Sequence, residues 1–102
     1  MSSLYKEFLE NPKDFNGYED LKENFKIKIP ENFNFAYDIV DRYAKDEPQK
    51  RALVWCDDAG EEKTFTFKEM SDMSKKTANF LIAHGIRKGD AVMLILRRRY
   101  EF

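Results

Sequence analysis

The side chains that could take part in chemistry are few and stand apart in this sequence. His84 is the only histidine, Cys56 is the only cysteine, and Asp57 and Asp58 are neighbouring carboxylates. An imidazole can act as a general base, a thiolate as a nucleophile, and paired carboxylates as ligands for a hard cation. The sequence places no serine or cysteine where it would complete a nucleophilic pair with His84. We therefore assign no catalytic residue and no metal ligand.

Each of these side chains has a structural role that fits its position. His84 falls in the last turn of an expected helix, where the helix dipole favours a cation. Cys56 falls in an expected strand, which predicts a small buried hydrophobe. Asp57 and Asp58 fall at the tip of an expected hairpin, where aspartates are common turn residues.

A nucleotide-binding loop would require a cluster of glycines, because backbone amides must approach the phosphates closely. The four glycines are instead scattered among expected turns, at Gly17, Gly60, Gly85 and Gly89. Neither GxxxxGK[ST] nor GxGxxG occurs. We therefore assign no cofactor-binding residue.

A short basic run, Arg97 to Arg99, follows the last apolar stretch. One interpretation is a contact with an anion or phosphate at the end of a strand, where α/β proteins tend to bind ligands. The other is a solvated strand end that limits pairing with foreign edges. We favour the second interpretation.

Charge and length exclude several classes of protein. The formal net charge is −1, whereas nucleic-acid binding requires concentrated positive charge. No apolar run approaches the ~20 residues that a membrane span needs. The N-terminal residues lack a basic-then-apolar signal pattern, and one cysteine cannot form an internal disulfide. We expect a cytoplasmic domain with no nucleic-acid partner and no membrane span.

The first confident element is a helix over residues 34–46. Phe35, Ile39 and Tyr43 recur at a spacing of four and form an apolar stripe. Asp41 is expected to face away from that stripe. Residues 1–31 before it are interpreted as an N-terminal arm that wraps a larger body, or equally as a partly disordered leader.

A β-hairpin follows, with strands expected over residues 52–56 and 63–66. The first strand is apolar on both faces, and the second is rich in threonine and phenylalanine, which favour strands. Gly60 in the acidic turn can adopt the positive φ that such turns require.

The next helix, expected over residues 67–84, carries a signal at each end. Thr66 and Glu69 have the spacing of a capping box. Gly85 followed by Ile86 predicts a Schellman ending, in which a glycine takes a left-handed conformation. The expected inner face consists of Met70, Met73, Thr77 and Leu81.

The last expected element is a strand over residues 91–96, which has no polar alternation. A strand that is apolar on both faces belongs inside a sheet covered on both sides, usually a parallel one. Its parallel neighbour would require a crossover and a further strand, which this sequence does not contain. The side chains expected at the resulting interface are Val92, Leu94 and Leu96 on one face, and Met93 and Ile95 on the other.

These elements make an α/β chain, or α+β when taken in isolation, and their order resembles a known family. The phrases that carry the resemblance are "FNFAYDIVDRYA", "RALVW", "TFTFKEM" and "GIRKGDAVMLIL". In this combination they are similar to the N-terminal region of AMP-forming acyl-CoA synthetases, of the adenylate-forming, AMP-binding enzyme family. Together with "RRRYEF", the first phrase resembles the acetyl- and medium-chain branch most. The resemblance covers residues 15–102.

The resemblance implies a scaffold role for this chain. Enzymes of the family join a carboxylate to ATP and pass the acyl group to coenzyme A, so ATP, magnesium and coenzyme A are implied for the full-length enzyme. Their phosphate loop, ribose-binding aspartate and late lysine match no position here, so no functional residue is carried over. The resemblance implies an arm over residues 1–31 and the truncated start of the AMP-binding domain over residues 32–102. The chain alone is predicted to be inactive.

Three interpretations stay open from the sequence. The chain is part of an acyl-CoA ligase, or a small interaction and oligomerisation module derived from that fold, or a nucleotide-binding domain with an unrecognised loop. The missing glycine loop and the nearly neutral charge weigh against the third. The expected partners are the remainder of the parent enzyme or a second copy of the chain, with a carboxylate substrate only in the full-length enzyme.

Overall fold

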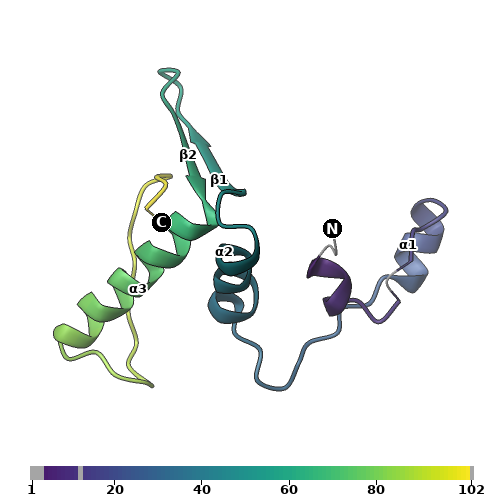
Figure 1. Ribbon diagram of the computed structural model, residues 1–102, viewed down its shortest axis with the longest axis horizontal. Helices are drawn as coiled ribbons and strands as arrows, with labels where there is room; N and C mark the ends of the chain where they lie inside the picture. Colours follow the sequence, from purple (N-terminus) through teal and green to yellow (C-terminus); the bar gives the residue numbers. More distant parts are fainter. Residues whose placement is uncertain (1–3, 12, 102) are drawn as a thin grey trace. The chain divides into compact units, whose positions relative to one another are not determined.

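The computed structural model describes residues 4–11 and 13–101. The chain divides into two compact units, residues 1–34 and residues 35–102, which are described separately below (Figure 1). The second unit contains the hairpin and the longest helix, and it positions the segment of greatest functional interest.

The first unit combines two short helices with one strand-like contact. The 3-10 helix η1 spans Leu4–Phe8, and the helix α1 spans Tyr18–Asn24. Leu9 and Ile27 form an isolated antiparallel bridge. The ring of Phe8 meets that of Phe33 edge-on, with centroids 5.4 Å apart. Local backbone pairing and ring contacts therefore hold this unit, in which Leu4 is buried.

The helix expected over residues 34–46 is present. It comprises a π-helical stretch, η2, over Ala36–Asp41, followed directly by α2 over Arg42–Asp46. Ile39 and Tyr43 of the predicted stripe are half-buried, and Tyr43 stacks on Phe67 with ring centroids 4.6 Å apart. Phe35 stays 63% exposed, so the stripe is covered only along part of its length.

The predicted hairpin is confirmed as two antiparallel strands, β1 over Arg51–Cys56 and β2 over Glu62–Thr66. Residues that face each other across an antiparallel pair point to the same side of the sheet. Leu53 lies opposite Phe65 and Trp55 opposite Lys63, and this face is half-buried. The other face, which includes Val54, is exposed. Only one of the two faces of β1 is therefore covered.

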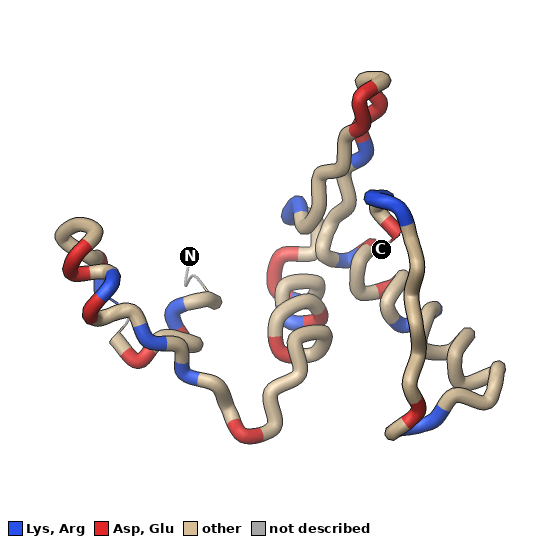
Figure 2. Tube along the Cα trace, turned by 180° about the vertical axis from the view of Figure 1, so that it is seen from behind, with Lys and Arg blue, Asp and Glu red and all other residues tan. Residues whose placement is uncertain are grey.

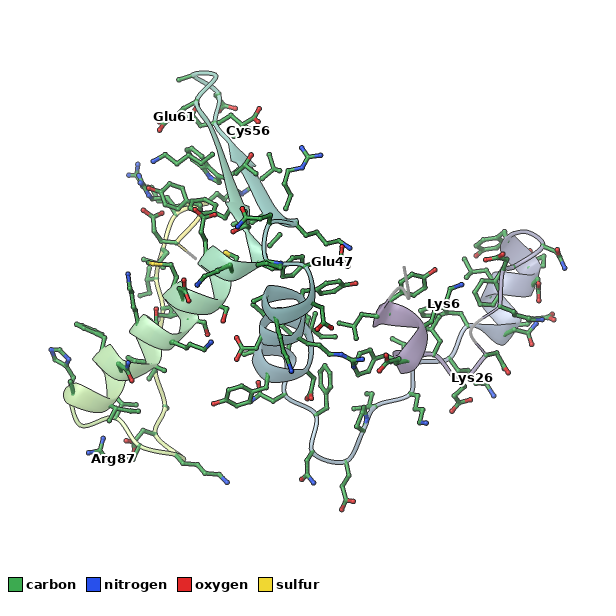
Figure 3. All side chains as sticks on the ribbon, viewed as in Figure 1. Lys6, Lys26, Glu47, Cys56, Glu61 and Arg87 are labelled. Atoms are coloured by element: carbon green, nitrogen blue, oxygen red, sulfur yellow. The ribbon has the colours of Figure 1, made fainter. Side chains whose placement is uncertain are left out.

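The prediction that Cys56 is buried is wrong. Its side chain lies near the tip of the hairpin and is exposed (Figure 3). The pairing register explains this position, because Cys56 shares the outer face of the hairpin with Val54. The turn beyond it is held by Asp57, whose Oδ1 accepts hydrogen bonds from the backbone N–H groups of Ala59 and Glu61 at 3.0 and 2.8 Å.

Helix α3 spans Phe67–Ala83, and both of its predicted ends are confirmed. The backbone N–H of Glu69 donates to Thr66 Oγ1 at 3.2 Å, and the Glu69 carboxylate accepts from the backbone N–H of Thr66 at 2.8 Å. At the other end Gly85 has a φ of 87°, and the N–H of Ile86 donates to the carbonyl of Leu81 at 3.0 Å. On the predicted inner face, Met70 and Leu81 are half-buried, whereas Met73 is 54% exposed.

A polar cluster joins α3 to η2. Ser71 is only 2% exposed, and its Oγ donates to Asp41 Oδ1 at 2.6 Å. Lys75 Nζ donates to Ser71 Oγ at 2.8 Å and lies 3.8 Å from Asp41 Oδ1. The prediction that Asp41 faces away from the covered side is therefore wrong. Its carboxylate can lie against α3 because the hydroxyl and the ammonium group satisfy it there.

Helices together with a β-hairpin confirm the predicted α/β class. The structure corrects one element of it, the buried strand over residues 91–96. This segment is neither helix nor strand, and the only sheet among the described residues is the two-stranded β1–β2 hairpin. A strand exists through hydrogen bonds to a neighbouring strand, and none of the described residues supplies such a neighbour for this segment.

Candidate association segment

The start of the exposed apolar segment is fixed by the turn that follows α3. The guanidinium of Arg87 donates from Nη1 to the carbonyls of Ile82 and Ile86 at 2.9 and 3.0 Å. The backbone N–H of Arg87 donates to Asp90 Oδ2 at 2.7 Å, and the N–H of Asp90 donates to the Arg87 carbonyl at 3.1 Å. These bonds satisfy carbonyls at the helix end and direct the chain back along a new path.

Residues 91–96 form an uncharged stretch between charged ends, which Figure 2 shows as a tan run from the turn to the terminal arginines. Among the described residues, none makes a hydrogen bond to the backbone of this stretch. The exposed fractions of its side chains alternate along the chain: Val92 49%, Met93 83%, Leu94 64%, Ile95 86%, Leu96 52%. Met93 and Ile95 are thus almost fully exposed, whereas Val92, Leu94 and Leu96 are partly covered.

The far end of the segment is anchored on the hairpin by Tyr100. Its ring lies 5.4 Å from that of Trp55 and 5.2 Å from that of Phe65, between centroids. Its hydroxyl accepts a hydrogen bond from Lys63 Nζ at 3.0 Å. The indole N–H of Trp55 donates to the carbonyl of Arg98 at 3.1 Å. The segment is therefore held at both ends while its middle is unpaired.

Charge stabilises this anchor modestly. The hydrogen bond to the Tyr100 hydroxyl raises the pKa of Lys63 and so favours its charged form. The guanidinium of Arg99 donates to both carboxylate oxygens of Glu101, at 3.0 and 3.1 Å, and this bond lowers the pKa of Glu101. The side chains of Lys63, Arg99 and Glu101 are 40%, 56% and 48% exposed, so solvent screens these interactions.

The five predicted interface residues, Val92 to Leu96, all lie exposed on a segment that pairs with no other described residue. Two contacts were not predicted from the sequence: that of Tyr100 with the hairpin and that of Ser71 with Asp41. The contact of Tyr100 with Trp55 joins residues that β2 and α3 separate along the chain, and its only sequence signal is a lone aromatic residue after a basic run. Ser71 lies four residues after Phe67, so helical spacing alone could have placed it on the covered face of α3.

The other chemistry-bearing residues have structural surroundings. His84 Nδ1 lies 2.8 Å from the carbonyl of Phe80, and its ring packs on the Phe80 ring at 4.2 Å between centroids. Asp57 holds the hairpin turn. Among the described residues, no three histidine, cysteine or acidic side chains gather as metal ligands would. No helix in this part of the chain has both the length and the apolar character that crossing a membrane requires.

Comparison with known proteins gives a consistent match. The sequence model of the AMP-binding enzyme family, described as "AMP-binding enzyme", matches residues 40–102. The chain is 41% identical to "Acyl-coenzyme A synthetase ACSM3, mitochondrial" of Mus musculus over 109 aligned residues, which cover 100% of this chain and 19% of that protein. The human protein of the same name is 41% identical over 97 residues, 89% of this chain and 17% of its own length.

A second type of relative matches a shorter stretch. "Acyl-coenzyme A synthetase ACSM2, mitochondrial" of Rattus norvegicus is 42% identical over 81 residues, 74% of this chain and 14% of that protein. The chain therefore spans about a fifth, or less, of the length of the curated relatives that it matches.

Proposed function

Because the chain belongs to the AMP-binding enzyme family, we propose that it is the N-terminal part of an AMP-forming acyl-CoA ligase. Such a ligase activates a carboxylic acid with ATP to an acyl-adenylate and transfers the acyl group to coenzyme A. The observation that carries the proposal is the 41% identity to an acyl-coenzyme A synthetase, which extends across the whole of this chain.

The described residues offer neither a phosphate loop for ATP nor a set of ligands for magnesium. Phosphate binding requires clustered backbone amides, and the four glycines lie far apart along the chain, at Gly17, Gly60, Gly85 and Gly89. Magnesium prefers carboxylate oxygens, and no such group of ligands forms among these residues. We therefore assign this chain no step of the reaction and place the cofactors with later parts of the enzyme.

We propose that this chain has a structural role in the enzyme, as part of the scaffold of the AMP-binding domain. In the proposed enzyme, residues 32–102 begin the AMP-binding domain and residues 1–31 form an arm. The segment 91–96 then contributes a strand to a larger sheet built from later residues. Its unpaired backbone and exposed side chains support this role, because a strand of such composition is suited to burial on both faces.

A second candidate is a stand-alone interaction or oligomerisation module that kept this part of the fold. The same exposed segment favours it, since an unpaired apolar stretch can receive a strand from another chain. The sequence of the coding DNA beyond the codon for Phe102 separates the two. A continuing frame with a Ser/Thr/Gly-rich loop and a late lysine supports the ligase, and an immediate stop codon in an intact gene supports the module.

The first prediction concerns activity. The 102-residue chain is expected to release no pyrophosphate from Mg-ATP with acetate or butyrate, and to give no binding heat with Mg-ATP in calorimetry. Adenylation requires donors positioned around the reacting phosphate, which the described residues do not provide. A longer protein that includes the later motifs serves as the positive control. Turnover by the 102-residue chain itself would contradict the proposal.

The location of the proposed enzyme is a separate question. The sequence predicts the cytoplasm, whereas the printed names of the relatives say that those proteins are mitochondrial. We propose, from the sequence prediction alone, that the enzyme acts in the cytoplasm. Fractionation of cells that express the protein from its native gene tests this, and recovery of the protein with mitochondria would contradict it.

A further inference from the structure

The segment 91–96 is the part of the described chain that most resembles a strand without a partner. It runs as an extended trace in Figure 1, its residues are exposed, and its backbone makes no hydrogen bond to any other described residue. The charges at its two ends have opposite sign. Asp90 precedes it, and Arg97 and Arg98 follow it. These ends restrict which strand could pair with it.

A second copy of the same segment meets those restrictions when it runs antiparallel. Parallel pairing in register would bring Asp90 close to its own copy and the arginines close to theirs, which is unfavourable. Antiparallel pairing reverses one copy, so that acidic and basic ends meet. It therefore gives charge complementarity at both ends of the apolar stretch.

Symmetry then selects the register. A two-fold axis perpendicular to the paired strands leaves the even-numbered side chains of both copies on one face of the sheet. Residues that lie opposite each other in an antiparallel pair also share a face, so even-numbered residues must lie opposite even-numbered ones. Centring the pair on Leu94 places Asp90 opposite Arg98 of the second copy. It also places every large apolar side chain opposite another one: Val92 opposite Leu96, Met93 opposite Ile95, and Leu94 opposite itself.

Neighbouring symmetric registers are poorer. Centring on Met93 places Asp90 opposite Leu96, so the carboxylate loses its basic partner. Centring on Ile95 places Met93 opposite Arg97 and moves Asp90 away from Arg98. The register centred on Leu94 is thus the one that satisfies both the charges and the apolar side chains.

The local hydrogen bonds agree with this register. Opposed residues in an antiparallel pair alternate between those that exchange backbone hydrogen bonds and those that do not. The N–H of Asp90 is already bound to the Arg87 carbonyl, and the carbonyl of Arg98 is already bound to the Trp55 indole. Even-numbered residues would therefore form the pairs without backbone bonds, and Met93 would exchange bonds with Ile95.

The Asp90 side chain is also available for such a pair. Its Oδ2 accepts from the N–H of Arg87, and Oδ1 has no partner among the described residues. The guanidinium of Arg98 is exposed and pairs with none of them. An ion pair between the two copies would therefore leave the turn after α3 intact.

We propose that the 102-residue chain forms a two-fold symmetric dimer in which the segments 91–96 pair as antiparallel strands centred on Leu94, with Asp90 of each copy opposite Arg98 of the other. This dimer concerns the 102-residue chain by itself, because in a longer enzyme a strand from the enzyme's own sheet would occupy the same edge. Failure of the dimer would leave the family assignment and the activity test unaffected.

Reversing one charge at a time tests the register. The variants Asp90→Arg and Arg98→Asp each place like charges opposite one another at both ends of the dimer. Each should raise the dimer dissociation constant about tenfold, as measured by sedimentation equilibrium at low ionic strength. An equimolar mixture of the two variants has complementary charges at both ends and should regain the affinity of the unmodified chain.

The mixture also controls for damage to the fold. If a substitution weakened association by disturbing the fold, the same damage would be present in the mixture, and mixing would not restore the affinity. Arg97→Asp is the matched control, because it changes the net charge as Arg98→Asp does but lies opposite Ala91. It should change the dissociation constant far less. A chain that is monomeric at all concentrations would overturn the proposal. Association that the single variants do not weaken, or that the mixture does not restore, would place the contact elsewhere, for example at the edges of the β1–β2 hairpin.

A cross-link provides a second readout. In a pair without backbone bonds the two Cα atoms are about 4.5 Å apart, which a disulfide can span. Leu94→Cys in a Cys56→Ser background should therefore form a covalent dimer under mild oxidation. Met93→Cys in the same background should cross-link much more slowly, because Met93 lies opposite Ile95. Equal rates for the two variants would contradict the register.

Discussion

Strand β1 and the segment 91–96 have similar apolar sequences but differ in whether they pair with another strand. β1, over Arg51–Cys56, pairs with β2 along its length, and its inner face is half-covered. The segment 91–96 is richer in aliphatic side chains, yet it pairs with nothing among the described residues and is exposed throughout. Apolar content and strand propensity are therefore not what separates them.

The difference lies in the distance along the chain to a partner. β1 has its partner after a short turn that Asp57 and Gly60 hold in place, so pairing costs little loop entropy. The segment 91–96 would need a strand that lies elsewhere in a larger protein or in a second copy. A strand thus requires a partner, and a sequence can have the composition of a strand without containing the partner.

The largest expected effect comes from placing charge in the middle of the segment. Leu94→Lys removes a large aliphatic side chain from each copy and puts like charges opposite one another. Burial of each such side chain contributes about 1.5–3 kcal/mol, so the dimer dissociation constant should rise at least about 100-fold. Sedimentation equilibrium measures this change.

Val54→Lys is the matched control for Leu94→Lys. Val54 is an exposed aliphatic residue on the outer face of a strand that already has its partner. We expect no change in association. If both variants weakened association equally, the contrast between β1 and the segment 91–96 would be broken.

The next effect concerns the cluster that holds η2 against α3. Ser71→Ala removes a hydroxyl that donates to Asp41 and accepts from Lys75, and the site is 2% exposed. Loss of a buried hydrogen-bonding partner costs about 1–3 kcal/mol of the free energy of unfolding. Urea unfolding followed by circular dichroism measures it.

Ser74→Ala provides the comparison on the same helix, because Ser74 is exposed. Its effect should stay within about 0.5 kcal/mol. A loss at Ser71 no greater than at Ser74 would mean that the polar cluster does not stabilise this part of the chain.

A smaller effect is expected at the start of α3. Thr66→Ala removes the oxygen that caps the N–H of Glu69, and it should lower the free energy of unfolding by about 1 kcal/mol. Thr77→Ala tests the reverse. Thr77 is exposed within the helix, where alanine is favoured, so that variant should be neutral or slightly stabilising. The same sign for both variants in thermal unfolding would argue against a capping role for Thr66.

The smallest effect is the pH dependence of the same cap. The bonds that Glu69 accepts from the backbone N–H and hydroxyl of Thr66 lower the pKa of its carboxyl below the ordinary value of 4.5. A lowered folded-state pKa means that the stabilisation is present above the unfolded-state pKa and is lost as the pH falls through the folded-state pKa. α3 should therefore lose helicity on the acid side.

Glu69→Gln isolates this contribution from those of other carboxyls. The variant should show a shallower loss of helicity by circular dichroism between pH 7 and pH 2, because its side chain does not titrate. Identical acid transitions in the variant and the unmodified chain would show that the cap does not contribute through the charge of Glu69.

The local parts of this fold could be predicted from sequence because their causes are local. The capping box at Thr66 and the left-handed Gly85 each depend on residues within one or two turns, and both are confirmed. The hairpin is confirmed for the same reason. Family membership was also predictable, because it depends on the order of such elements along the chain.

The parts that could not be predicted depend on register and on distant contacts. Cys56 is exposed because the hairpin register places it with Val54, and its own residue type does not reveal that. Asp41 lies against α3 because Ser71, thirty residues away, supplies a hydrogen bond. The composition of the segment 91–96 predicts a strand, but no described residue supplies the partner with which it would pair.

Amide hydrogen exchange, measured residue by residue by NMR at low and high protein concentration, tests most directly whether the segment 91–96 lacks a partner within its own chain. At low concentration its amides should exchange rapidly while those that join β1 to β2 are protected. At high concentration the amides of Met93 and Ile95 should become protected and those of Val92 and Leu94 should not. Protection of the segment equal to that of β1 in the dilute chain would contradict the central claim, because it would show that a single copy already supplies the missing strand.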